Sequence, residues 1–238
     1  MSGRFSGRIA LVTGASRGIG RAAAIALGRE GAHVICVART VGGLEETDDA
    51  IQKAGGTATL VPLNLKDFAA IDRLGASIFE RWKKLDAFFG NAGTLGALTP
   101  LTHLDPKVFQ ELLDINVTAN WRLLRSFDPL LRQSDAGRVL MVSSAAARRN
   151  TAFWGGYAMS KAALETITFT YAAECNGTNV KVNALDPGPV RTIMRAKAMP
   201  GEDPATLPRP EELTPTILDA LSPANDSHGE LIKFRKGA

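Results

Sequence analysis

Apolar stretches of strand length alternate with longer amphipathic stretches along most of the chain. The apolar stretches lie at residues 8–13, 33–38, 57–63, 85–89, 138–142, 180–185 and 229–234. The stretches at 19–30, 44–54, 68–82 and 106–132, and one that starts near residue 157, have helical spacing. Continuous apolar strands separated by helices are typical of a parallel sheet covered on both faces. We therefore predict an α/β fold with a doubly wound, mostly parallel seven-stranded sheet between two helical layers.

The length of 238 residues suits a single α/β domain, and no internal boundary interrupts the alternation. We therefore expect one domain over residues 1–238. Prolines become dense after residue 187 and two methionines lie between charged residues there. This composition predicts a flexible loop with short helices at about residues 188–223, at the carboxyl edge of the sheet.

Composition argues against nucleic-acid, membrane and metal binding. The chain has 28 Lys and Arg against 24 Asp and Glu, and its arginines are scattered, so nucleic-acid binding is not indicated. No apolar run approaches the ~20 residues of a membrane span. The two cysteines, Cys36 and Cys175, lie in apolar contexts, which favours buried thiols over a disulfide. No metal-ligand spacing occurs, and we expect a cytoplasmic protein.

A glycine-rich turn, T-G-A-S-R-G-I-G, follows the first strand directly and opens a helix. Gly14 permits a tight turn, Gly18 lets the backbone approach a pyrophosphate, and Gly20 lets the helix pack close to the strand. Backbone N–H groups at the helix start then face phosphates. The alternative is a plain β–α turn with glycine for geometry alone. The position and the three glycines favour a dinucleotide site.

Two arginines suggest which dinucleotide binds. A carboxylate near the end of the second strand would bind a ribose 2′-hydroxyl, but no Asp or Glu occurs from residue 31 to residue 44. Arg39 follows that strand and Arg17 lies inside the glycine turn, where guanidinium groups suit a 2′-phosphate. This pattern favours NADP over NAD, with two solvated surface arginines as the alternative.

Candidate acid–base chemistry lies between residues 141 and 161. Tyr157 and Lys161 are four residues apart, so a helix places them on one face. An ammonium beside a phenol favours the phenolate and lowers a pKa that is ordinarily about 10. Ser143 or Ser144, at the end of the preceding strand, could offer a hydroxyl to the same substrate oxygen.

Taken together, these motifs resemble the short-chain dehydrogenase/reductase family of compact single-domain enzymes, from residue 8 to about residue 192. Residues 13–20 match the family's TGxxxGxG turn, and Asn91, Ala92 and Gly93 match its NAG motif. Ser144 lies thirteen residues before Tyr157, the family's usual separation, and is therefore preferred over Ser143. The resemblance implies a Rossmann fold and a homo-oligomer, either dimer or tetramer.

The resemblance also implies a catalytic set and a wider cofactor site. Tyr157 would be the general acid or base, Lys161 would lower its pKa and bind ribose hydroxyls, and Ser144 would polarise the substrate. Asn116, in D-I-N-V-T, would hold a relay water. The implied cofactor-binding residues are Gly14, Ser16, Arg17, Gly18, Ile19, Gly20, Arg39, Asn64, Leu65, Asn91, Ala92, Gly93, Tyr157, Lys161, Pro187, Gly188, Val190 and Thr192.

Two departures from the family pattern stand out. Asn64 replaces the usual aspartate after the third strand, and its amide oxygen can still accept a hydrogen bond from adenine. The C-terminus, G-E-L-I-K-F-R-K-G-A, lacks the family's V-D-G-G ending, which leaves dimer and tetramer equally open.

The expected function is NADP(H)-dependent hydride transfer on a small alcohol or carbonyl compound. The alternative is a catalytically silent dinucleotide-binding or scaffolding module, because fold alone does not fix function. Arg148 and Arg149 either meet an acidic substrate group or lie in solvent. Residues near the tyrosine and the loop suggest an apolar or aromatic substrate: Leu95, Ala146, Phe153, Trp154, Pro189, Met194 and Met199.

Overall fold

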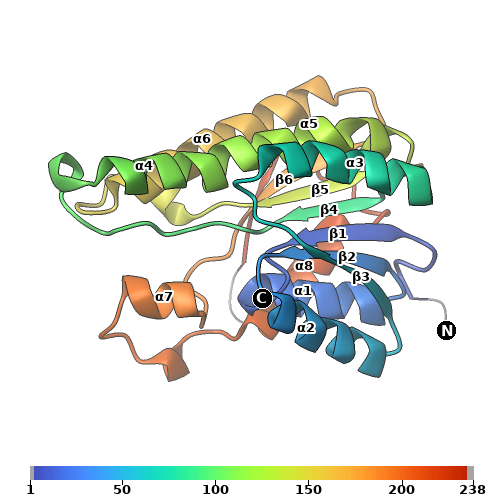
Figure 1. Cartoon of the computed structure of the whole chain (residues 1–238), viewed down its shortest axis with the longest axis horizontal. Coiled ribbons are helices and arrows are strands. Elements are labelled where there is room, and N and C mark those ends of the chain that lie inside the picture. The colour runs from blue at the N-terminus through green and yellow to red at the C-terminus, as the bar shows by residue number, and fades with distance from the viewer. Residues whose placement is uncertain (1–2, 235–238) are drawn as a thin grey trace.

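Seven strands form one entirely parallel sheet in a computed structural model that describes residues 3–234 (Figure 1). The strands are β1 (Ile9–Thr13), β2 (His33–Ala38), β3 (Thr57–Pro62), β4 (Ala87–Gly90), β5 (Arg138–Val142), β6 (Lys181–Asp186) and β7 (Leu231–Lys233). Their order is β3-β2-β1-β4-β5-β6-β7. The α/β prediction is confirmed, and the last strand is parallel like the others.

Helices cover both faces of the sheet (Figure 1). The helices α1 (Gly18–Arg29), α2 (Val41–Lys53) and α8 (Thr214–Leu221) pack on one face. The helices α3 (Phe68–Trp82), α5 (Ala119–Arg132) and α6 (Gly155–Glu174) pack on the other. The shorter elements are η1 (Leu101–His103), α4 (Pro106–Leu112), η2 (Leu113–Thr118), η3 (Ala145–Arg148), α7 (Ile193–Ala198), η4 (Pro204–Thr206) and η5 (Pro210–Leu213).

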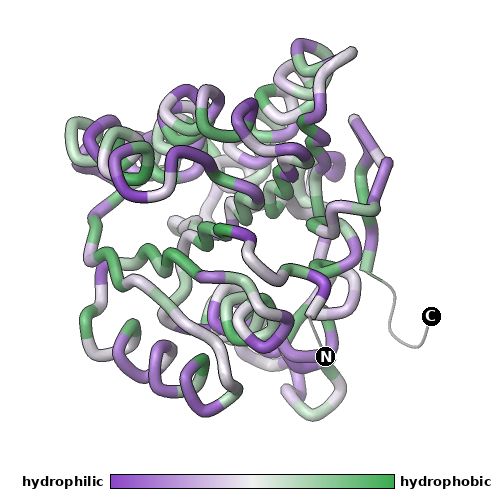
Figure 2. Tube along the Cα trace, turned by 90° about the vertical axis from the view of Figure 1, so that its right-hand side faces the viewer, coloured by the Kyte–Doolittle hydropathy of each residue, from purple (hydrophilic) through white to green (hydrophobic). Residues whose placement is uncertain are grey.

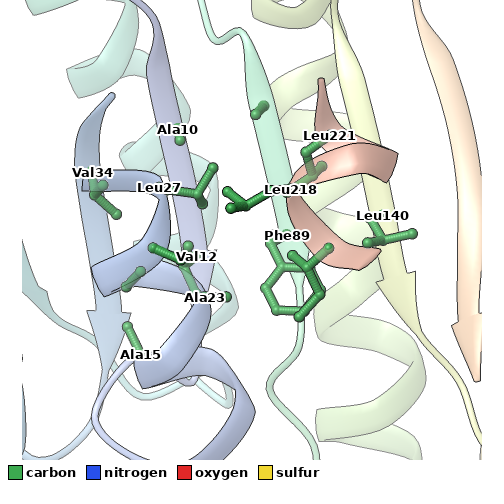
Figure 3. Packing of buried hydrophobic residues seen from close by; sticks show 14 of the residues in the cluster. Ala10, Val12, Ala15, Ala23, Leu27, Val34, Phe89, Leu140, Leu218 and Leu221 are labelled. Atoms are coloured by element: carbon green, nitrogen blue, oxygen red, sulfur yellow. The ribbon is translucent and has the colours of Figure 1, made fainter. Parts of the chain in front are cut away.

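Two apolar cores result from the alternation of side chains along the strands. Val12 of β1 points into the core beneath α1 and α8, whereas Leu11 points into the core beneath α5. Figure 3 shows Leu27 and Leu218 meeting over Val12 and Phe89 in the first core. Figure 2 shows hydrophilic stretches on the outer helical turns. Both faces of the central strands are therefore buried, which explains their continuous apolar sequence.

The helix predicted over residues 106–132 is interrupted. A π-helical segment, η2, separates α4 from α5 and contains the fully buried Asn116. The amide of Asn120 donates hydrogen bonds to the carbonyl oxygens of Ile115 (3.2 Å) and Asn116 (3.0 Å). Because the wider π turn disturbs the regular helical ladder, this side chain satisfies backbone oxygens at the disturbance.

The proline-rich region ends in a buried helix. Leu213, Ile217, Leu218 and Leu221 are each at most 5 % exposed and belong to the core beneath α1. The loop expected at about residues 188–223 therefore ends near η5, because α8 belongs to the helical layer. The flexibility of the remaining segment stays a prediction.

A buried carboxylate ties three parts of the fold together at the amino ends of the central strands. Asp86 precedes β4 and its oxygens accept hydrogen bonds from the backbone N–H of Ile9 (2.8 Å) and the hydroxyl of Ser134 (2.6 Å). Lys84 and Arg8 supply the compensating positive charge at 3.0 and 3.4 Å. Since the side chain of Asp86 is fully buried, its removal leaves several partners unpaired.

We expect Asp86→Ala to lower the free energy of unfolding by about 3 kcal/mol, because buried donors lose their acceptor. Urea denaturation measures this. The matched control is Asp135→Ala, which removes the exposed second partner of Arg8 and should cost less than about 1 kcal/mol. Equal losses in the two variants would contradict the role of Asp86.

Candidate active site

A cavity of about 870 Å³ opens at the carboxyl ends of the strands. The strand order reverses between β1 and β4, and such a switch point leaves a crevice where ligands bind. Among the predicted cofactor-binding residues, the cavity is lined by Gly14, Ser16, Arg17, Gly18, Ile19, Arg39, Asn64, Leu65, Asn91, Ala92, Gly93, Tyr157, Lys161, Pro187, Gly188, Val190 and Thr192. Of the catalytic set, Ser144 lines it as well, whereas Asn116 lies behind its wall.

The glycine turn folds tightly on itself between β1 and α1. Gly14 has a φ of 68° and Gly18 a φ of 58°, a region that favours glycine. A side chain on Gly20 would place its Cβ 2.3 Å from the carbonyl oxygen of Gly14. Gly20 does not itself line the cavity, and its lack of a Cβ is what allows α1 to start so close to the turn. Because α1 begins at Gly18, its first N–H groups point towards the cavity end of the turn.

Thr13, to which the sequence analysis gave no role, joins this turn to the next strand. Its hydroxyl oxygen accepts hydrogen bonds from the backbone N–H groups of Asn91 and Ala92, both at 3.0 Å. The side-chain amide of Asn91 donates in return to the carbonyl oxygen of Thr13 at 2.9 Å. The NAG motif is therefore held directly against the glycine turn. The sequence indicates this residue only as the threonine that begins the T-G-A-S-R-G-I-G motif.

The Lys161 ammonium is buried in the wall of the cavity. It is 3 % exposed and donates a hydrogen bond to the carbonyl oxygen of Val142, the last residue of β5, at 2.7 Å. Burial lowers the pKa of Lys161 to about 8, with the carboxylate of Glu165 acting in the opposite direction. A Cβ on Gly93 would lie 3.5 Å from this ammonium, in ordinary contact, and 3.1 Å from the side-chain oxygen of Asn116, so the NAG motif packs directly against both residues.

Tyr157 lies beside Lys161, whose ammonium is 5.8 Å from the centre of the phenol ring. We expected Lys161 to lower the pKa of Tyr157, and this is wrong for the geometry observed. Burial raises the pKa to about 12, a hydrogen bond with Ser144 lowers it, and Asp186 raises it further. The difference arises because burial disfavours the charged phenolate, and the ammonium is directed at the carbonyl of Val142.

The two candidate serines have separate partners. The hydroxyl of Ser143 donates to Glu165 at 2.5 Å, whereas Ser144 lines the cavity beside Tyr157 and lowers the pKa of its phenol. The hydroxyl of Ser144 also accepts from the N–H of Ala146 at 3.2 Å and so caps η3. The geometry thus agrees with the preference for Ser144.

Asn116 braces the wall behind the catalytic pair. Its side-chain oxygen accepts from the N–H of Thr94 (2.8 Å), and its amide donates to the carbonyl of Thr94 (2.9 Å) and to the hydroxyl of Ser160 (2.9 Å). Ser160 in turn donates to the carbonyl oxygen of Tyr157 at 2.8 Å. Asn116 therefore connects the loop after β4 to α6, and Ser160 is a member of the site that motif spacing did not indicate.

The arginines divide into two groups. Arg17 and Arg39 are exposed on the cavity lining, and neither has an ion-pair partner among the described residues. Arg148 is also exposed and does not line the cavity, but it forms ion pairs with Glu165 and Asp186. Arg149 is exposed on the adjacent loop.

Only some of the residues predicted to contact the substrate line the cavity. Leu95, Trp154 and Met194 line the cavity, and the ring of Trp154 packs edge-on against Tyr157 with centroids 6.1 Å apart. Ala146, Phe153, Pro189 and Met199 do not line it. Thr192 caps α7 by accepting from the N–H of Arg195 (3.1 Å), and its methyl group faces Gly18. The segment after β6 therefore passes close to the glycine turn at Thr192.

A doubly wound parallel sheet with a glycine turn and a buried Tyr–Lys pair in one cavity defines a dinucleotide-dependent oxidoreductase. Comparison with known proteins agrees, since the pattern of the family described as short chain dehydrogenase matches residues 8–203. The chain belongs to this family, and the resemblance inferred from its motifs is confirmed. Like its relatives, it is an oxidoreductase.

Three relatives span most of the chain. The Escherichia coli (strain K12) protein named "Uncharacterized oxidoreductase YciK" is 37 % identical over 89 % of this chain and 84 % of its own. A short chain dehydrogenase structure from Pseudomonas syringae is 36 % identical, with a TM-score of 0.94 over 98 % of this chain and 96 % of that one. A Shigella flexneri 2a structure, complexed with NADP, is 35 % identical, with a TM-score of 0.93 over 98 and 99 %.

The described residues contain neither a metal-binding cluster nor a membrane-spanning helix. Within residues 3–234, no three His, Cys, Asp or Glu side chains gather in a way that could hold a metal ion. The same residues contain no helix long and apolar enough to cross a membrane.

Gly20→Ala is expected to lower the free energy of unfolding by about 1–3 kcal/mol, because the added methyl group overlaps the Gly14 carbonyl. Gly42→Ala is the matched control, since a Cβ there meets nothing within 4 Å and α2 gains about 0.5 kcal/mol of helix propensity. Urea denaturation compares the two. A Gly20 variant as stable as the Gly42 variant would contradict the tight packing of the turn.

Proposed function

We propose that this protein is an NADP(H)-dependent oxidoreductase that transfers hydride between the nicotinamide and a small alcohol or carbonyl compound. The observation that carries this is one cavity that brings the glycine turn, Tyr157, Lys161 and Ser144 together. Leu95, Trp154 and Met194 line its apolar part, which supports an apolar or aromatic carbonyl substrate.

In this proposal, Tyr157 is the general acid of carbonyl reduction. A phenol whose pKa is about 12 is protonated at neutral pH and can donate to the carbonyl oxygen. Ser144, which lines the cavity beside Tyr157, donates its hydroxyl to the same oxygen and polarises the carbonyl. The bound dinucleotide supplies the hydride. In the reverse direction, Tyr157 must lose its proton, so alcohol oxidation requires a more alkaline solution.

Lys161 and Asn116 support the acid in this scheme. The Lys161 ammonium lies on the cavity wall, where it can donate to ribose hydroxyls of the dinucleotide while held by Val142. Asn116 fixes the loop that carries Gly93 against α6, and its proposed link to a relay water rests on the family resemblance.

NADP is the proposed cofactor because of the charge at the adenosine end of the cavity. Arg17 and Arg39 both line it, and the relative from Shigella flexneri is complexed with NADP. Guanidinium groups bind phosphate through charge-assisted hydrogen bonds. Asn64 lines the same end, and its side-chain oxygen accepts from the N–H of Lys66 at 3.2 Å. NAD lacks the 2′-phosphate that the two arginines are proposed to bind.

Tyr157→Phe should lower kcat for NADPH-dependent carbonyl reduction by at least about 100-fold, because the proton donor is lost. The dissociation constant for NADPH should change little, since the ring remains. Absorbance assays with a panel of carbonyl compounds measure the first, and fluorescence titration measures the second. Unchanged turnover would overturn the mechanism. Tight NADPH binding by the unmodified protein with no turnover on any carbonyl would instead support the silent binding module.

Arg39→Asp is expected to weaken NADPH binding by about 10- to 100-fold, because a charge-assisted contact becomes a repulsion. Binding of NADH should be unchanged or stronger. Arg73→Asp, on α3 at the other face of the sheet, makes the same change of charge away from the cavity and is the control. Tighter binding of NADH than of NADPH by the unmodified protein would contradict the cofactor assignment.

We further propose that the protein forms a homo-oligomer and is located in the cytoplasm. Trp121 is 46 % exposed on α5 and lies near the guanidinium groups of Arg122 and Arg125, which supports a homo-oligomer formed through an exposed aromatic surface. Cys36 and Cys175 are both buried free thiols, which supports a reducing compartment such as the cytoplasm. Light scattering in solution gives the number of subunits.

A further inference from the structure

An ionic cluster lies directly behind the catalytic residues. Arg148, in η3, pairs with Glu165 of α6 through one guanidinium nitrogen and with Asp186 at the end of β6 through another. The side chains of Glu165 and Asp186 are only 12 and 9 % exposed, whereas that of Arg148 is 34 % exposed. Two carboxylates that are largely removed from water require a compensating cation, and Arg148 supplies it.

Each member of this cluster is connected to a residue of the proposed mechanism. Glu165 lies one helical turn after Lys161 and accepts the hydrogen bond from Ser143. Asp186 accepts from the N–H of Gly188 at 3.2 Å, at the start of the segment that lines the cavity. Arg148 itself closes the short helix that begins after Ser144.

We propose that Arg148 is a positioning residue of the active site: it neutralises Glu165 and Asp186 behind Tyr157 and Lys161 and holds the Ser144 segment against α6 and β6. This inference rests on the proposed function only for its kinetic consequences. The ion pairs themselves connect three elements, η3, α6 and β6, that each contribute to the cavity or its support.

The sign of the electrostatic effect follows from the charges. Asp186 raises the pKa of Tyr157, and Glu165 raises the pKa of Lys161. Loss of the guanidinium leaves both carboxylates unopposed, so the tyrosine and the lysine should both hold their protons to higher pH. The other charged residues that line the cavity stay the same in this comparison: Arg17, Arg39, Glu111, Arg191, Arg195 and Lys197.

The test titrates Tyr157 directly. The chain has two tyrosines, so in a Tyr171→Phe background the ultraviolet absorbance of tyrosinate reports Tyr157 alone. Tyr171 hydrogen-bonds Asp128 from the opposite end of α6, and its replacement leaves the cavity intact. The titration uses the NADP⁺ complex, because the positive nicotinamide favours the phenolate and lowers the midpoint.

Arg148→Gln should raise the tyrosinate midpoint by about half to one pH unit, from one lost charge at intermediate dielectric. The alkaline shift should also appear in the pH dependence of kcat for alcohol oxidation. Arg148→Lys restores the charge and should restore most of the midpoint. Arg149→Gln is the matched control, because it removes the neighbouring exposed arginine, and its midpoint should equal that of the background protein.

Thermal denaturation accompanies each titration and shows that the variants are folded. A folded Arg148→Gln variant with an unchanged midpoint would overturn the inference, as would an equal shift in Arg149→Gln. A shift that Arg148→Lys does not reverse would also overturn it, since the charge would then not be the cause. Failure of the unmodified protein to bind NADP⁺ would refute the proposed function, and the role of Arg148 would then be decided by whether Arg148→Gln lowers the melting temperature more than Arg149→Gln does.

Discussion

The burial of one ammonium group organises the site of this protein. Lys161 lies in the cavity wall because the carbonyl of Val142 accepts its hydrogen bond, and Gly93 of the loop after β4 lies close beside its ammonium. These contacts come from α6, the end of β5 and the loop after β4, so the three elements must meet within hydrogen-bond distance. The parallel sheet makes this meeting possible, because all its strands end at the same edge.

The same edge is stabilised by a continuous series of polar contacts. Thr13 joins the glycine turn to the NAG motif, and Asn116 joins the loop after that motif to α6 through Ser160. Arg148 then joins α6 to the end of β6. Buried polar groups of this kind are costly unless each finds a partner. These contacts therefore fix the relative positions of the elements that surround the cavity.

Much of this could be predicted from the sequence, because local pattern determined it. Continuous apolar strands defined the parallel sheet, and the spacing of Tyr157 and Lys161 placed both on one helical face. The π turn at Asn116 could not be predicted, since it depends on Asn120 and on packing between helices. The partners of Arg148 lie 17 and 38 residues away and meet it only in the folded chain. The pKa of Tyr157 was misjudged because burial is a tertiary property.

The position of β1 in the sheet also has a consequence for how the chain folds. Its first neighbour, β2, begins at residue 33, but its second, β4, begins only at residue 87, after two helices and β3. During synthesis, one edge of the central strand therefore remains unpaired until more than a third of the chain has been made. No strand pair can form as a local hairpin, so sheet formation requires contacts distant in sequence and is slow. The glycine turn therefore gains its contacts with the NAG motif only after β4, the second neighbour of β1, has been made.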